Sequence, residues 1–112
     1  METISWDDFA KVELRVGRII DARVFAEARK PAYALQVDFG AEIGIRKSSA
    51  QIMKLYAPEE LIGKLVVGVL NFPKKQIGPL MSECLVTGFY DSNGNVALCV
   101  PDKTVPLGAK LG

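Results

Sequence analysis

Apolar and polar residues alternate along much of the chain. In residues 12–25, six of the seven even positions are apolar, and this period of two predicts a long β-strand. Gly17 lies inside the segment, where a glycine permits the bulge or sharp coiling that a closing barrel needs. Residues 33–40 repeat the alternation. The apolar face of this second predicted strand consists of Tyr33, Leu35, Val37 and Phe39.

Two more strands are predicted in the middle of the chain. Residues 42–47 alternate again, and we expect Ile43 and Ile45 to point inward and Arg46 outward. Residues 65–70 are continuously apolar, which is typical of a central strand that is covered on both faces.

A hairpin is predicted near the C-terminal end. The apolar segments 84–90 and 96–100 flank Asn93-Gly94, a dipeptide that favours the tight turn of a β-hairpin. Residues 71–83 separate this hairpin from the central strand, and their two prolines and glycine predict a loop.

Helical segments are expected to be short. Ser5 is followed three residues later by an acid, a capping pattern that predicts an N-terminal turn of helix. Ser48 or Ser49 is expected to cap another turn. Pro58 suits a first helical position and Gly63 suits a left-handed helix end.

The order of these elements predicts the fold class. Three strands, a helix and further strands ending in a hairpin fit a five-stranded oligonucleotide/oligosaccharide-binding (OB-fold) barrel. A small sandwich or an SH3-like barrel fits the periodicity nearly as well. The length of 112 residues fits one domain. We therefore expect an all-β (β-rich) domain over residues 1–112 with short helices and with terminal extensions at 1–11 and 101–112.

Composition excludes several classes of function. The chain contains no histidine, which removes Ser-His-Asp and Cys-His catalysis and histidine-ligated metal sites. Cys84 and Cys99 are too few for a disulfide framework or a four-thiolate zinc site. We expect no catalytic residues, no metal and no cofactor, and hence not an enzyme. No apolar run is long enough to insert in a membrane, the first residues lack a signal-peptide pattern, and a cytoplasmic location is expected.

Charge is unevenly distributed along the chain. The net charge is +1, but residues 46–75 carry six basic and two acidic residues, a local balance of +4. A basic segment on a nearly neutral chain permits contact with phosphates, although charge alone favours a solvated face with scattered lysines. The mean hydropathy of +0.18 is apolar for a small chain and suggests that part of the surface closes against a second copy.

Two segments are candidates for ligand binding, because loops on a rigid barrel often carry function. Residues 71–83 combine lysines with apolar residues and prolines, and residues 25–33 combine basic residues with a tyrosine. The apolar members favour an extended peptide, whereas the lysines favour RNA phosphates. The tyrosine is equally well explained as core. The candidate peptide- or RNA-binding residues are Arg29, Pro31, Tyr33, Lys47, Asn71, Phe72, Lys74, Lys75 and Ser82.

Several motifs resemble a known family. They are LRVGRI (14–19), EARKPAYALQVDFG (27–40), EIGIRKSSAQI (42–52), NFPKKQIGPLMSECLVTG (71–88) and PDKTVPLGAKLG (101–112). Together they resemble the tRNA-binding-domain family, and EIGIRKSSAQI is similar to its CsaA-like branch of export-related chaperones.

The resemblance implies a function and partners. CsaA-like proteins are homodimers whose terminal segments pack across a two-fold axis. They hold unfolded preproteins ready for export and interact with the SecA translocase, while other family members bind tRNA. The implied ligands are thus unfolded preproteins or, alternatively, tRNA. The implied dimer-interface residues are Trp6, Phe9, Leu107 and Leu111.

Overall fold

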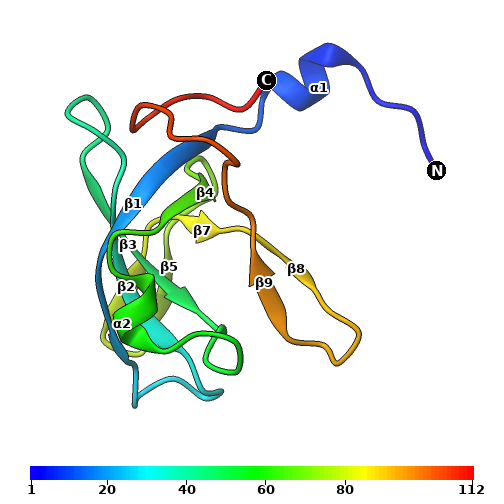
Figure 1. Ribbon diagram of the computed structural model, residues 1–112. Helices are drawn as coiled ribbons and strands as arrows, with labels where there is room; N and C mark the ends of the chain where they lie inside the picture. Colours follow the sequence, from blue (N-terminus) through cyan, green and yellow to red (C-terminus); the bar gives the residue numbers. More distant parts are fainter.

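A five-stranded antiparallel sheet curls into a nearly closed barrel (Figure 1). The computed structural model describes residues 1–112. The strands of this sheet, in the order β3-β2-β1-β4-β7, are β1 Leu14–Val24, β2 Tyr33–Asp38, β3 Ile45–Ala50, β4 Leu65–Val69 and β7 Leu85–Val86. The other elements are α1 Trp6–Ala10, α2 Pro58–Leu61, β5 Lys75–Ile77, β6 Leu80–Ser82, β8 Gly88–Tyr90 and β9 Val96–Leu98. The predicted all-β class and five-stranded barrel are confirmed.

The barrel is closed between β3 and the chain that enters β7. The Glu83 backbone N–H donates to the Lys47 carbonyl at 2.8 Å, and the Lys47 N–H donates to Glu83 Oε1 at 3.0 Å. One residue further along each segment, the buried Ser48 hydroxyl donates to the Cys84 carbonyl at 2.9 Å. These bonds satisfy polar groups that closure takes out of water.

The strand β1 contains a bulge that the sequence pattern did not predict correctly. Its register with β2 skips Ile20, so the face that turns to the core changes there. Just before the bulge Gly17 and Ile19 face the core, and Ile19 is fully buried while Ile20 is exposed. A Cβ at Gly17 would lie 2.5 Å from Val37 Cγ1. The missing side chain at Gly17 therefore leaves room for the core residues, and the bulge itself lies elsewhere, at Ile20.

The second strand follows its prediction, and the third does not. The odd residues of β2 are all buried, as expected. In β3, pairing with β2 turns Arg46 and Ser48 inward, whereas Ile45 is 54% exposed and the expectation that it points inward is wrong. Ser48 and Ser49 lie in this strand instead of capping a helix, because the buried Ser48 hydroxyl already has the Cys84 carbonyl as its partner.

The other predicted turns and caps occur at the expected residues. Ser5 caps α1 and forms a capping box with Asp8. Pro58 begins α2, and Gly63 follows it at φ +89°. The expected C-terminal hairpin is β8–β9. Residues 71–83, predicted to be a loop, contain the β5–β6 hairpin, whose turn includes Gly78 at φ +55°.

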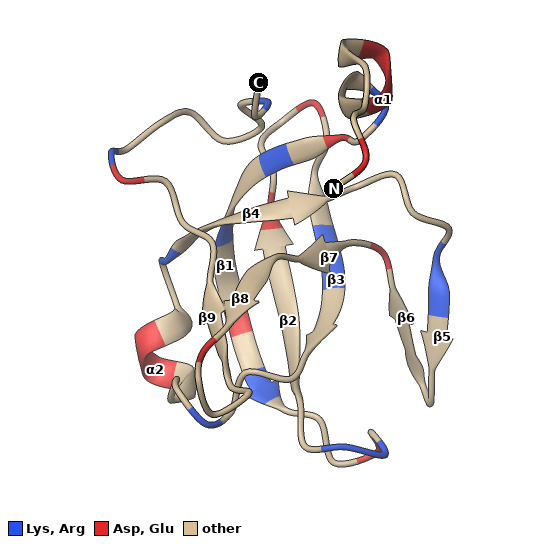
Figure 2. Ribbon diagram, turned by 90° about the vertical axis from the view of Figure 1, so that its right-hand side faces the viewer, with Lys and Arg blue, Asp and Glu red and all other residues tan.

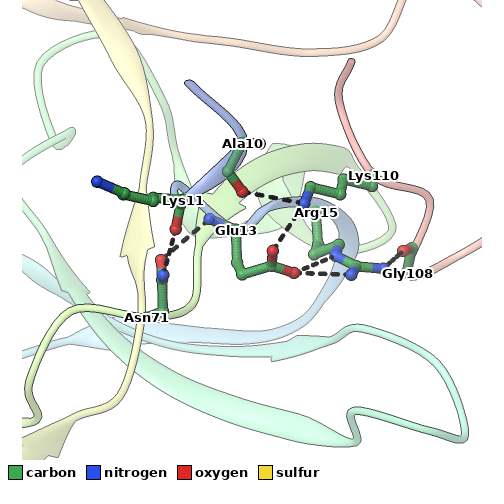
Figure 3. Close-up of polar contacts among 7 residues, drawn as sticks. All are labelled: Ala10, Lys11, Glu13, Arg15, Asn71, Gly108 and Lys110. Atoms are coloured by element: carbon green, nitrogen blue, oxygen red, sulfur yellow. Dashed lines mark hydrogen bonds and ion pairs between the residues drawn. The ribbon is translucent and has the colours of Figure 1, made fainter. Parts of the chain in front are cut away.

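The two terminal segments meet at a polar network beside the start of β1 (Figure 3). The Glu13 carboxylate accepts from Arg15 at 2.7 Å and from Lys110 at 2.8 Å. These two cations hold the pKa of Glu13 below its ordinary value, with the Lys110 hydrogen bond contributing most. Arg15 also donates to the Gly108 carbonyl, and Lys110 donates to the carbonyl of Ala10. The network joins α1, β1 and the C-terminal segment.

Candidate ligand-binding site

Three segments that are distant in the sequence meet beside the outer face of β3. They are the loop between β1 and β2, strand β3 itself, and residues 72–85, which include the β5–β6 hairpin. The hairpin stands beside the barrel next to β3 and has a basic segment at β5 (Figure 2). A groove lies between these segments, and it has two sections of different chemistry.

The first section of the groove is mostly apolar. It has a volume of about 350 Å³ and is called the apolar section below. Phe72 is 58% exposed at its rim, and Leu85 is also exposed. The residues that line it are Ser49, Phe72, Pro73, Lys75, Ile77, Ser82, Glu83, Cys84 and Leu85.

The second section, called the basic section below, lies between β5 and the loop that joins β1 to β2. It has a volume of about 490 Å³. Ser49, Lys75 and Ile77 line both sections, so the groove is continuous. The residues that line the basic section are Glu27, Ala28, Arg29, Lys30, Ala32, Ser49, Gln51, Lys75, Gln76, Ile77 and Gly78.

The basic section carries positive charge that the protein does not neutralise by contact. Arg29, Lys30 and Lys75 are exposed, and none of them forms an ion pair. Lys74, in contrast, lies 3.6 Å from a carboxylate oxygen of Glu83. Of the four candidate cations on these two segments, three are therefore available to an anionic ligand, and Lys74 is the weaker contributor.

Asn71 has a structural role that differs from the predicted one. Its Oδ1 accepts from the Glu13 N–H at 3.0 Å, and its Nδ2 donates to the Lys11 carbonyl at 2.6 Å (Figure 3). Because both ends of the amide are occupied, Asn71 anchors the start of residues 72–85 to the junction of α1 and β1. The ligand contact expected of Asn71 stays a prediction.

Tyr33 is a core residue and not a surface contact. Its side chain is 4% exposed, and its hydroxyl donates to the Tyr56 carbonyl at 2.8 Å. The alternation of β2 had left this alternative open, and pairing with β1 and β3 on both sides turns the ring into the barrel.

The other predicted site residues lie at or near the groove. Arg29, Phe72 and Lys75 line it, and Ser82 lines the apolar section with its hydroxyl 3.4 Å from the Cys84 carbonyl. Pro31 is exposed in the loop that borders the basic section. Lys47 instead lines a smaller neighbouring depression on the outer face of β1–β3, which also includes Asp21, Arg23 and Gln36.

Several groove residues were not predicted from the sequence. Ser49 was interpreted as a helix cap, and Ile77 and Leu85 were not singled out. Their signal was weak, because Ile77 belongs to a strand of only three residues. Extending the alternation of residues 45–47 through residue 50 groups Ser49 with Ile45 and Lys47. That face is the outer one in the structure, whereas the sequence pattern predicts it to be the inner one.

Glu83 predicts a pH dependence of stability. Its pKa is lowered from 4.5, first by the hydrogen bond from the Lys47 N–H and then by the charge of Lys74. A lowered folded-state pKa gives a contribution that is complete above the unfolded-state pKa and is lost as pH falls through the folded-state value. We expect Glu83→Gln to be less stable at pH 7 by less than about 1 kcal/mol, since the group is partly exposed.

Urea denaturation at pH 7, 5 and 3 checks this expectation. The difference between the wild-type protein and the Glu83→Gln variant should persist at pH 5 and shrink by pH 3. A difference that stays constant over this range would show that the charge of Glu83 does not contribute.

Cys84, the cysteine that lines the groove, is not an activated nucleophile. Burial raises the pKa of Cys84 to about 11. At neutral pH the thiol therefore stays protonated, and the thiolate is the reactive form. What the site offers chemically is non-covalent contact through apolar side chains, three cations and hydroxyl groups.

A second apolar surface lies on the terminal segments. The helix α1 has no buried residue, and Trp6 is 80% exposed with its ring edge-to-face against Phe9 at 6.2 Å between centroids. Leu111 is exposed and Leu107 is half-buried. The N-terminal arm extends away from the barrel beside them (Figure 1).

No helix in the structure combines the length and the hydropathy needed to cross a membrane.

Comparison with known proteins gives two kinds of relative. The family model described as "Putative tRNA binding domain" matches residues 14–110. The crystal structure of chaperone CsaA from Bacillus anthracis is similar at a TM-score of 0.91 and 43% identity, over 99% of this chain and 100% of that one. CsaA from Picrophilus torridus is similar at 0.91 and 45%, over 98% and 100%.

Methionine–tRNA ligase from Pyrococcus horikoshii is 41% identical over 111 residues. The match covers 99% of this chain but only 15% of the ligase, so the chain corresponds to a small part of that enzyme.

Proposed function

Because the chain belongs to the tRNA-binding domain family, we propose that it is a binding protein whose groove holds extended, unfolded polypeptide, as a chaperone of the CsaA type would. The observation that carries the proposal is the continuity of the apolar and basic sections through Ser49, Lys75 and Ile77. An unfolded segment presents apolar and polar side chains in succession. A groove with both chemistries accepts such a segment without requiring one sequence.

Binding at this groove is expected to be weak and reversible. Apolar burial contributes roughly 25 cal/mol per Å² before the cost of ordering a flexible ligand, and a short segment covers little area. Reversibility suits a chaperone, since its client must leave in the unfolded state. The apolar side chains of a bound client are removed from water, which lowers the tendency of the client to aggregate.

We also propose that the protein acts as a homodimer. The exposed Trp6 and Leu111, with Phe9 and Leu107 beside them, support an interface built from residues 1–11 and 101–112. Two grooves on one dimer would raise the apparent affinity for a long client. Light scattering should give the mass of two chains, and Trp6→Glu should give one. A wild-type protein with the mass of one chain would contradict this proposal.

The clients that we propose are preproteins bound for export, with the SecA translocase as the partner that receives them. This part of the proposal is supported by the similarity to CsaA chaperones over the full chain.

Binding of tRNA is the second candidate function. It is favoured by the three unpaired cations of the basic section and by the match to the tRNA-binding domain model. The similarity to part of a methionine–tRNA ligase points the same way. The same groove would then hold phosphates instead of acidic or polar side chains.

Salt dependence separates the two candidates. The purified protein is titrated with total tRNA and with an unfolded presequence peptide at 50 and 200 mM salt. Three phosphate contacts predict that tRNA affinity falls roughly 20- to 40-fold over this range. Peptide affinity should change by less than about threefold, because apolar contacts are not screened. Absence of peptide binding at both salt concentrations would overturn the chaperone proposal.

A pair of lysine variants tests the assignment of the basic section. Lys75→Ala should lower the slope of log affinity for tRNA against log salt by about one, since one phosphate contact is lost. Lys74→Ala is the matched control and should change the slope less, because Lys74 already pairs with Glu83. Equal effects of the two variants would contradict the assignment. The double variant should weaken tRNA binding more than Lys75→Ala alone, with Arg29 and Lys30 left in place, and should keep most peptide binding.

A further inference from the structure

Strand β5 has one free edge. It pairs only with β6, in the register Lys75↔Ser82, Gln76↔Met81 and Ile77↔Leu80. Apart from these pairs, no backbone group of residues 72–82 forms a hydrogen bond with backbone elsewhere in the chain. The N–H and C=O groups on the outer side of β5 therefore have no protein backbone partner.

Strand β5 lies along the groove. Residues 75–78 form one wall of the basic section, and residues 27–30 of the loop between β1 and β2 form the other. At its other end the groove opens into the apolar section, where Phe72 and Ile77 present apolar side chains. A linear ligand in the groove would therefore run beside the backbone of β5.

The edge is short and its length is limited on both sides. Pro73 precedes β5 and Pro79 precedes β6, and neither can donate a backbone hydrogen bond. A two-stranded hairpin is marginally stable in water. A third strand would add hydrogen bonds and thereby stabilise it. Prolines and lysines are the devices by which proteins limit pairing at open edges. Here they restrict pairing to a few residues, which keeps it reversible.

We propose that an extended polypeptide segment binds by adding a third strand to the free edge of β5. The segment has an apolar side chain that enters the apolar section and, close after it, an acidic residue beside Arg29 or Lys75. This inference rests on the proposed chaperone function and specifies how that function recognises its client. Hydrogen bonds between main chains do not depend on the side chains of the ligand. Strand addition therefore explains how one short groove accepts many sequences.

Two observations favour a polypeptide over other occupants. A strand edge offers alternating N–H and C=O groups, and a polypeptide backbone supplies the complementary alternation, whereas a sugar–phosphate backbone has no N–H donor. The unpaired cations of the basic section are complementary to a carboxylate, and Glu27 is the only acidic residue among its lining residues. The segment is thus expected to be neutral to acidic.

N-methylated peptides test this mode of binding. The probe is a fluorescent nine-residue peptide with blocked ends, a central leucine and an aspartate two residues after it, and threonine elsewhere. The single leucine fixes the register, so two N-methylated versions can be compared. In one the odd positions, two residues before and after the leucine, are methylated. In the other the even positions, directly next to the leucine, are methylated. In an antiparallel or parallel pair, only alternate residues of a strand direct their N–H groups to a given neighbour.

We expect one N-methylated version to lose at least tenfold in affinity and the other to stay within threefold of the parent. Equal affinities of both versions and the parent would overturn strand addition while leaving peptide binding, and hence the proposed function, intact. Equal losses in both versions would also overturn it, since they would report a general effect of methylation. A parent peptide that does not bind, in a sample that binds total tRNA, would overturn the proposed function together with this inference.

Discussion

Replacing Phe39 by alanine is expected to lower the free energy of unfolding by about 3–5 kcal/mol, a large part of the total for a small domain. Phe39 is 1% exposed. Its ring fills the space above two glycines, since a Cβ at Gly17 or Gly68 would lie 2.8–2.9 Å from ring atoms. Truncation would leave a cavity at the centre of the barrel that neither glycine can fill.

Urea denaturation measures this effect, and Phe72→Ala provides the matched control. The same side chain is removed there from an exposed position, so the free energy of unfolding should change by less than about 0.5 kcal/mol. If the two variants lost equal stability, the ring of Phe39 would not be the centre of the core.

The same control variant is expected to have the largest effect on binding. Phe72→Ala should weaken binding of an unfolded peptide at least tenfold, or about 1.4 kcal/mol. Phe72 provides the largest exposed apolar surface among the residues of the apolar section, and aromatic anchors of this kind carry much of the energy of an interface. Fluorescence anisotropy with a labelled peptide measures the loss.

Phe89→Ala is the control for this prediction. Phe89 is 68% exposed on the β8–β9 hairpin and does not line the groove. Its removal should leave peptide affinity within about twofold. A loss at Phe89 with none at Phe72 would move the binding site from the groove to this hairpin.

Much of the fold was predictable because the barrel is built from local patterns. The alternation of Tyr33 to Phe39 requires only that one face be buried, and β2 is paired on both sides. Ser5, Pro58 and Gly63 act within one turn of their own helices. Such signals depend on neighbouring residues, so a sequence carries them directly.

The errors occurred where a distant segment determines the structure. Ser48 has a polar side chain that is buried only because the Cys84 carbonyl, 36 residues away, accepts its hydrogen bond. The structural role of Asn71 was missed because its partners, at residues 11 and 13, are not apparent from the neighbouring sequence. The bulge at Ile20 depends on the register with β2, and no local residue specifies it.

The candidate site was predictable as segments and not as individual contacts. Arg29, Phe72 and Lys75 stood out because their segments combine basic residues with apolar or aromatic ones, and all three line the groove. Ser49 and Ile77, which join the two sections, carry no such signal. Their importance follows from the position of the β5–β6 hairpin beside β3.

Amide chemical-shift mapping tests whether the three segments form one groove, because it reports every backbone position at once. The ¹⁵N-labelled protein is titrated with the unlabelled leucine–aspartate peptide. We expect the largest shifts to fall on residues 27–32, 47–51 and 72–85 together, with little change in α1 and the β8–β9 hairpin. Shifts confined to one of these three segments, or centred on α1 or β8–β9, would contradict a single groove formed by segments that are distant in the sequence.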